Sequence, residues 1–381
     1  MSKLNLQPQQ LKHIHFPNLD ALRGIAAGVV VLSHIELLKP NFNLKTLPFN
    51  SLLKTGGSIA VTLFFVLSGF LITYLLMNEK EKKQKIFLKE FYIRRTLRLW
   101  PLFYLTLFIC YIIVPKFFPS FSANTGWFSF FLNALFLTNV TYVIKLLPPL
   151  GTAVWSIGIE EQFYIFWPLV LKKTRAHSLM KLLVGIILAF YMLKAALVYF
   201  SSYNAYIHKM RILVNITRYD CLLVGAVGAL LYKGYILKIG KLQINYSFFT
   251  SLAAQLILYS LLLISILANS FYQVPIMHQW YSFLFMPMIL NMAGNEKSIV
   301  KIDNAILNYL GKISYSMYLL HMFVIAALLK FLIPYWQNKD PITQNIIIYS
   351  LVIFSTIFVS SVSYYLIEKP FFRLKEKFQA P

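Results

Sequence analysis

The feature that most constrains this chain is a succession of long apolar runs separated by short polar segments. A bilayer hydrocarbon core about 30 Å thick requires roughly 20 apolar residues per spanning helix, and many runs here reach that length. Hydrophobic residues make up 58% of the 381 residues and aromatic residues 17%, a composition far more apolar than that of a soluble domain. The sequence therefore predicts an all-α, polytopic integral membrane protein.

The runs predict about ten transmembrane helices. We expect them over residues 20–38, 57–77, 97–114, 150–171, 179–200, 212–232, 245–268, 280–294, 314–333 and 343–367. Residues 127–144 are also apolar, but counting them as a span would place the basic residues Lys172, Lys173 and Arg175 outside, so we expect a re-entrant or interfacial segment. The predicted organisation is a cytoplasmic N-terminus (1–19), one transmembrane domain (20–367) and a cytoplasmic tail (368–381).

The net charge of +23 is explained by membrane topology, and we expect no nucleic acid partner. Sorting the 36 Lys and Arg residues by the predicted spans places 23 in cytoplasmic segments, eight in outer segments and five within spans. This bias toward one side predicts that both termini face the cytoplasm. A basic surface also attracts anionic lipid headgroups, so the lipid bilayer itself is an expected partner.

Thiol and metal chemistry have little support in the sequence. The two cysteines, Cys110 and Cys221, both lie in apolar runs, which favours neither a disulfide framework nor a cysteine metal site. We expect no metal and no permanently bound cofactor. No internal repeat stands out, which weakens a secondary-transporter interpretation and leaves that class open.

The first predicted span, in LDALRGIAAGVVVLSH, carries a cation and an imidazole. Arg23 and His34 are eleven residues apart, so they share a helix face and lie about 16 Å apart along the axis. An ionisable residue at membrane depth is a functional hypothesis, and histidine can act as a base near neutral pH. The alternative is a histidine bonded to a neighbouring carbonyl and an arginine that snorkels to headgroups. Gly24 and Gly28 form a G-x-x-x-G pair that favours helix packing.

Two further motifs follow in the second and third spans. In FFVLSGFLIT, Ser68 lacks the frame of a hydrolase nucleophile, so we expect a helix contact or a hydrogen bond to a ligand. In FYIRRTLRLWP, Arg95 and Arg98 are three residues apart and share a helix face, and guanidinium groups suit phosphate recognition. A basic belt at the membrane interface is the equal alternative.

The fourth span, in WSIGIEEQFYIFWPL, places carboxylates among aromatic residues. Such groups should face a cavity or pair with a buried cation. We take Glu161 as a candidate catalytic residue beside His34, and Tyr164 as a candidate binding residue. Arg218 and Asp220, in RYDCLLVG, are two further polar residues in the sixth predicted span. They are candidate binding residues, although each could instead orient the other.

The motif GKISYSMYLLH leads into the ninth predicted span and places His321, another candidate binding residue, inside it. The order of all these motifs, closed by a terminal EKPF, resembles the acyltransferase-three family of membrane O-acyltransferases from about Leu19 to Leu374. The resemblance implies that His34 is the catalytic histidine and that Arg23, Arg95 and Arg98 are the required basic residues. It also implies an acyl-CoA donor, acetyl-CoA above all, and a carbohydrate or glycolipid acceptor at the cell membrane.

Three alternatives stay open at this point. His34 could act as a base in direct transfer, or it could first become acylated. The chain could instead be a transporter of a lipid-linked sugar or acyl group, or an acyltransferase that modifies a small molecule at the cytoplasmic face.

Overall fold

The computed structural model describes residues 16–202, 204–236, 247–272, 276–332, 335 and 340–378. Within these ranges every regular element is a helix. The longer helices are α1 (Pro17–Leu38), α2 (Asn50–Lys83), α3 (Leu88–Phe108), α7 (Val154–Lys173), α8 (Ala176–Phe200), α9 (Ala205–Thr217), α10 (Tyr219–Ile236), α12 (Leu252–Phe271), α13 (His278–Gly294), α14 (Ala305–Phe331) and α15 (Pro341–Ser363). The shorter ones are α4 (Val114–Phe117), α5 (Trp127–Ala134), α6 (Thr138–Val143), α11 (Ser247–Thr250) and α16 (Lys369–Glu376).

The described part of the chain contains eight helical stretches long and apolar enough to cross a membrane. All ten predicted spans are helical over most of their length, but those at α7 and α13 are not among the eight. The all-α, polytopic architecture is confirmed. Which side of the membrane each terminus faces stays a prediction.

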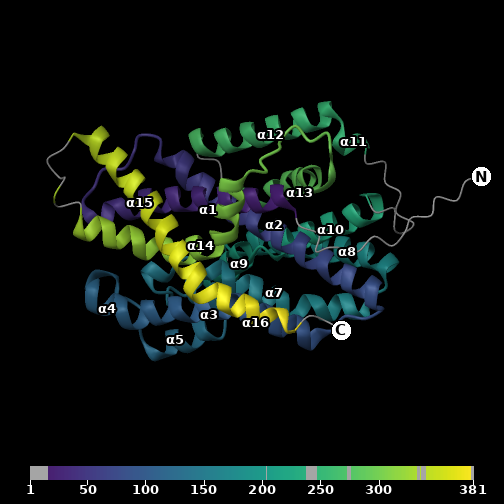
Figure 1. Cartoon of the computed structure of the whole chain (residues 1–381), viewed down its shortest axis with the longest axis horizontal. Coiled ribbons are helices and arrows are strands. Elements are labelled where there is room, and N and C mark those ends of the chain that lie inside the picture. The colour runs from purple at the N-terminus through teal and green to yellow at the C-terminus, as the bar shows by residue number, and fades with distance from the viewer. Residues whose placement is uncertain are drawn as a thin grey trace, which may run out of the picture.

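The helices are arranged in layers around α1 and α2 (Figure 1). α1 packs against α2 and α14, α2 packs against α10, and α14 packs against α15. Figure 1 shows α12 along one edge of the bundle and α3 with α16 along the opposite edge. Large apolar side chains at the periphery are exposed, such as Met192 of α8 (73%) and Phe354 of α15 (70%). Side chains of this kind, which would be costly in water, are the surface expected to face lipid.

Glycines set the closest helix contacts. A Cβ on Gly24 would lie 2.8 Å from the backbone of Gly311 in α14, and a Cβ on Gly69 would collide with the backbone of Leu222 in α10. Small residues allow membrane helices to approach at this distance. The packing role predicted for Gly24 is therefore confirmed, whereas a Cβ on Gly28 would meet open space.

The structure adds detail to two sequence expectations about spans. The predicted span 212–232 lies within one stretch that is long and apolar enough to cross a membrane, Ala205–Gly234, but Arg218, with a left-handed backbone (φ 48°), separates α9 from α10 inside it. The apolar pattern continues through the break, because hydropathy does not report backbone dihedral angles. Residues 127–144 form the short helices α5 and α6, which are too short to span a bilayer, as predicted.

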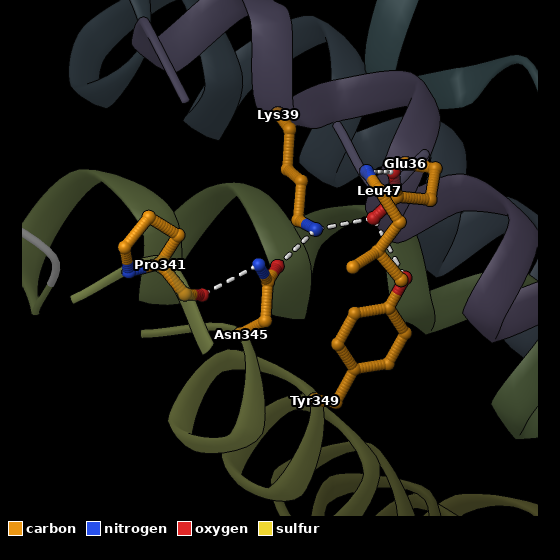
Figure 2. A network of polar contacts seen from close by, with 6 residues as sticks. All are labelled: Glu36, Lys39, Leu47, Pro341, Asn345 and Tyr349. Atoms are coloured by element: carbon orange, nitrogen blue, oxygen red, sulfur yellow. Dashed lines mark hydrogen bonds and ion pairs between the residues drawn. The ribbon is translucent and has the colours of Figure 1, made fainter. Parts of the chain in front are cut away.

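A buried ion pair at the end of α1 is connected to α15 by hydrogen bonds (Figure 2). The carboxylate of Glu36 accepts hydrogen bonds from Lys39, from the backbone N–H of Leu47 at 2.7 Å and from the Tyr349 hydroxyl at 2.6 Å. Lys39 also donates to Oδ1 of Asn345 at 2.5 Å and lies 4.9 Å from the centre of the Tyr349 ring. Neither charged side chain is exposed. Removing one of them would therefore leave the other as an uncompensated buried charge, so the network stabilises the junction only when both are present.

Candidate active site

A cavity of about 270 Å³ lies between five helices, and we call it the central cavity. Residues three or four apart on each helix line it, because such residues share a face. Its polar lining consists of Asp20 and Arg23 from α1, Ser68 and Tyr74 from α2, Arg95 and Arg98 from α3, Ser156, Glu160 and Tyr164 from α7, and Ser314, Tyr315 and Tyr318 from α14. The remaining lining is apolar and mostly comes from α2.

Five of the ten candidate site residues line this cavity. These are Arg23, Ser68, Arg95, Arg98 and Tyr164. Residues so far apart in sequence meet because α1, α2, α3 and α7 converge there. The other five candidates, His34, Glu161, Arg218, Asp220 and His321, do not line it.

One arginine of α3, Arg95, is held beside two aromatic rings. The Arg95 guanidinium lies 5.3 Å from the centre of the Tyr164 ring and 5.7 Å from that of Phe91. Arg95 and Arg98 both face the cavity, which confirms the shared face predicted from their spacing. Stacked and partly buried guanidinium groups of this kind are suited to an anionic ligand.

Arg23 brings a third guanidinium to the same cavity from α1. It lies 3.6 Å from the carboxylate of Asp20, one turn earlier, and its side chain is 19% exposed. The close approach of α1 to α14 at Gly24 places Arg23 near the α14 residues of the lining. The lining of the central cavity therefore contains three guanidinium groups and two carboxylates, those of Asp20 and Glu160.

The two adjacent glutamates of α7 point in different directions. Glu160 lines the cavity and accepts a hydrogen bond from Ser68 at 2.5 Å. Glu161 accepts from the indole N–H of Trp100 at 3.0 Å, and its other oxygen is buried without a hydrogen-bond partner among the described residues. The structure thus places Glu160 at the cavity, and the catalytic role predicted for Glu161 stays a prediction.

His34 lies beyond the end of the central cavity, packed against His321. The two imidazole rings meet edge to face with centroids 4.8 Å apart. Each ring uses Nδ1 on the carbonyl four residues earlier in its own helix, Val30 at 2.9 Å and Met317 at 3.0 Å. A carbonyl can only accept, so Nδ1 carries the proton in each ring and Nε2 carries the lone pair.

Tyr318 connects this histidine pair to the central cavity. Its ring lines the cavity, lies 6.1 Å from the His321 ring and meets the Phe64 ring edge to face at 5.8 Å. Its hydroxyl is 2.7 Å from that of Ser156. Tyr318 therefore lies between the arginine-lined cavity and His321, with Phe64 packed against its ring.

His321 differs from His34 in its burial. Its side chain is fully buried, and Nε2 has no hydrogen-bond partner within the described part of the chain. A buried acceptor left unpaired costs about 1–3 kcal/mol. The predicted binding role of His321 stays a prediction, and its observed neighbour is the other histidine.

Arg218 does not line the central cavity and instead contacts the first half of α2. It donates to the carbonyl of Ser58 and to the Thr62 hydroxyl, both at 3.1 Å, and lies 5.2 Å from the Trp155 ring. Asp220 forms an ion pair with Lys194 at 2.6 Å rather than with Arg218. Arg218 and Asp220 therefore do not bond to each other, as the alternative interpretation of the sequence expected, but each has partners of its own.

Sequence reasoning did not select several residues that line the cavity. Glu160 is the other carboxylate of the fourth predicted span, and it was not selected as a site residue. Ser156 and Tyr315 were not selected either. A signal was available for Ser156 and Glu160, because they lie eight and four residues before Tyr164 and share its helix face. For Tyr315 only the packing of α14 against α3 brings it to the cavity, where its hydroxyl donates to the Leu99 carbonyl at 2.7 Å.

The arrangement defines an anion-binding space that leads toward two imidazoles with available lone pairs. No group of three His, Cys, Asp or Glu side chains in the described ranges is placed to hold a metal ion. Imidazoles with available lone pairs can transfer protons or act as nucleophiles, and guanidinium groups can bind a charged ligand. Such residues are suited to group transfer within a membrane.

Residues 16–365 match a family model described as an acyltransferase domain, that of the acyltransferase-three family. The match covers most of the chain, so the protein belongs to this family. The resemblance inferred from the motif order is confirmed.

Several curated proteins are similar in sequence. The peptidoglycan O-acetyltransferase OatA of Listeria monocytogenes is 36% identical over 161 residues, which cover 40% of this chain and 24% of that protein. A putative O-acetyltransferase of Staphylococcus aureus, SACOL0978, is 28% identical over 94% of this chain and 57% of its own length. The O-acetyltransferase OatA of S. aureus strain NCTC 8325 is 26% identical over 93% of this chain and 57% of its own.

The chain thus spans little more than half the length of these relatives, or less. No solved structure matches the chain significantly.

Proposed function

We propose that this acyltransferase moves an acetyl group from acetyl-CoA to a hydroxyl of a cell-surface polysaccharide or glycolipid, within the cell membrane. The observation that carries the proposal is the convergence of Arg23, Arg95 and Arg98 on one cavity. CoA is rich in phosphate, and guanidinium groups bind phosphate in a bidentate manner. The names of the relatives support O-acetyl transfer and, for one of them, a peptidoglycan acceptor.

In this proposal the acetyl thioester extends from the arginines past Tyr318 toward His34. His34 Nε2 takes the proton of the acceptor hydroxyl while the hydroxyl oxygen attacks the thioester carbonyl carbon. The carbon–sulfur bond then breaks, and the departing sulfur receives the proton from the imidazolium. The products are an O-acetyl ester and free CoA.

A two-step route gives the same products. His34 Nε2 first attacks the thioester carbonyl carbon, the carbon–sulfur bond breaks and CoA is released as a thiolate. The acceptor hydroxyl then attacks the acetyl carbon, the bond from that carbon to Nε2 breaks, and the hydroxyl proton passes to the thiolate. His321 packs against His34 and would hold the ring in place in either route. Ser68, Tyr164 and Tyr318 are candidate donors to the developing oxyanion.

In this proposal the Tyr318 ring has to move, because it lies between the central cavity and His321, which packs against His34. The thioester reaches the His34 imidazole once that ring rotates aside. The arginine-lined face would then serve the cytoplasmic donor and the opposite end the outer acceptor.

The test uses purified protein in nanodiscs with radiolabelled acetyl-CoA and candidate glycan acceptors. Acetyl transfer that requires His34 supports the proposal. Labelled acetyl trapped on His34 without acceptor favours the covalent route. Binding of acetyl-CoA without transfer to any carbohydrate, together with transfer to a small cytoplasmic alcohol, would replace the proposed acceptor class.

A further inference from the structure

A second, larger cavity of about 590 Å³ adjoins the central cavity, and we call it the vestibule. It is lined by Asp20, Arg23, Arg98, Ala305, Asn308, Tyr309, Lys312, Tyr315, Glu368, Phe372 and Lys375. Four of these, Asp20, Arg23, Arg98 and Tyr315, also line the central cavity. The two spaces therefore meet at a neck that contains two arginines.

The vestibule carries an excess of positive charge. Its four cations, Arg23, Arg98, Lys312 and Lys375, face two carboxylates, Asp20 and Glu368. Glu368 accepts a hydrogen bond from Ser316, and Asp20 lies beside Arg23. The cations are arranged in order, because the arginines lie at the neck and both lysines line only the outer space.

The vestibule also offers groups suited to a nucleobase. The Tyr309 and Phe372 side chains line it, and the Tyr309 hydroxyl donates to Ser361 at 2.8 Å, which fixes that ring. Nδ2 of Asn308 donates to Asp303 at 2.6 Å, whereas its buried Oδ1 has no hydrogen-bond partner in the described part of the chain. Aromatic faces stack on bases, and an orphaned carbonyl oxygen suits an exocyclic amine.

We propose that the vestibule binds the 3′-phosphorylated adenosine diphosphate portion of CoA. The inference rests on the proposed acetyl-CoA donor and names where its head group binds. In CoA the pyrophosphate lies between the pantetheine arm and the ribose, and the 3′-phosphate lies beyond it. This order matches the cations: Arg23 and Arg98 at the neck bind the pyrophosphate, and Lys312 and Lys375 bind the 3′-phosphate.

The remaining groups follow from the same placement. Adenine stacks on Tyr309 or Phe372 and donates its amine to Asn308 Oδ1, which satisfies the orphaned acceptor. The pantetheine arm enters the mostly apolar central cavity. Lys312 and Lys375 are thus specificity residues that distinguish CoA from carriers without the 3′-phosphate.

The test compares acetyl-CoA with acetyl-dephospho-CoA, which differs only in the 3′-phosphate. Binding is measured by calorimetry on the full chain in nanodiscs. The native protein should bind acetyl-CoA at least about 10- to 100-fold more tightly, since even one of the two lysine–phosphate hydrogen bonds is worth about 1.5–3 kcal/mol. Lys312→Gln with Lys375→Gln should reduce acetyl-CoA affinity to the dephospho level and leave acetyl-dephospho-CoA affinity unchanged.

Lys301→Gln is the matched control, because this exposed lysine lies near the start of α14 but does not line the vestibule. It removes the same charge and should change neither affinity by more than about twofold. Asn308→Ala should weaken both ligands equally, because both carry adenine.

The outcomes separate the two proposals. Equal binding of the two thioesters by the native protein overturns the vestibule assignment and leaves the proposed transfer reaction intact. A preference for acetyl-CoA that survives in the double variant overturns the assignment to Lys312 and Lys375. Absence of any acetyl-CoA binding or acetyl transfer in the native protein removes the proposed function and the inference with it.

Discussion

Replacing Glu36 with Gln should destabilise the protein strongly, because Glu36 neutralises Lys39 in a site with no solvent exposure. The carboxylate accepts three hydrogen bonds, from Lys39, Leu47 and Tyr349. The Gln side chain keeps the shape but leaves the lysine charge uncompensated. Breaking a buried pair by removing one partner typically costs about 3–5 kcal/mol, and we expect Glu36→Gln to lower the free energy of unfolding by that amount.

Two further variants divide this loss into its parts. Tyr349→Phe removes one hydrogen bond to a charged acceptor and should cost about 1.5–3 kcal/mol. Lys39→Met in the Glu36→Gln background removes the orphaned charge and should recover a large part of the loss, since apolar replacement of a whole buried pair is often neutral. Glu296→Gln makes the same chemical change at an exposed position and should stay within about 0.5 kcal/mol of the native protein.

Unfolding free energies would be measured by titrating SDS into mixed micelles and following tryptophan fluorescence. A loss below about 1 kcal/mol in Glu36→Gln would refute the reasoning, because it would mean that water reaches Lys39. A double variant less stable than Glu36→Gln would show instead that Lys39 is held by Asn345 and the Tyr349 ring rather than by the carboxylate.

Four further predictions address the site, the topology and the packing. His34→Asn should abolish acetyl transfer and leave expression and acetyl-CoA binding intact, because an amide is no base at neutral pH; near-native turnover in nanodiscs would make the histidine structural. Replacing Arg95 and Arg98 together with Gln should weaken acetyl-CoA binding by tenfold or more while acceptor binding changes little, and equal donor affinity by calorimetry would assign both to a lipid belt. A cysteine at Lys85 should resist an impermeant thiol reagent in intact cells and react after lysis, whereas strong labelling from outside would overturn the predicted orientation. Gly69→Val should lower the free energy of unfolding by several kcal/mol, and with it the SDS midpoint, because a Cβ there collides with the α10 backbone. An unchanged midpoint would mean that α2 and α10 can separate without cost.

The sequence predicted the face shared by Arg95 and Arg98 because helical periodicity relates spacing to direction. The sequence also led us to select Glu161 and not Glu160, whereas the structure places Glu160 in the lining of the cavity and Glu161 against Trp100. Adjacent residues of a helix point about 100° apart. Deciding between them requires knowing which side of α7 faces α2, and no local pattern contains that information.

The backbone at Arg218 marks another limit of the sequence. Its left-handed conformation is uncommon for a residue other than glycine, and the hydrogen bonds to Ser58 and Thr62 hold it there. Those partners lie some 160 positions earlier in the chain. An apolar run that reads as one continuous span therefore becomes two helices through a tertiary contact.

The sequence by itself determined the membrane class, the helical architecture and the family, because hydropathy, periodicity and motif order are properties of local stretches of chain. Only the tertiary structure decided that His34 meets His321 rather than the arginine-lined cavity, and that Tyr318 lies between that cavity and His321. It alone placed Lys312 and Lys375 on one vestibule with Arg23 and Arg98. The physical reason is that helix packing in a bilayer depends on close contacts between small residues on distant segments, and these contacts set which faces meet.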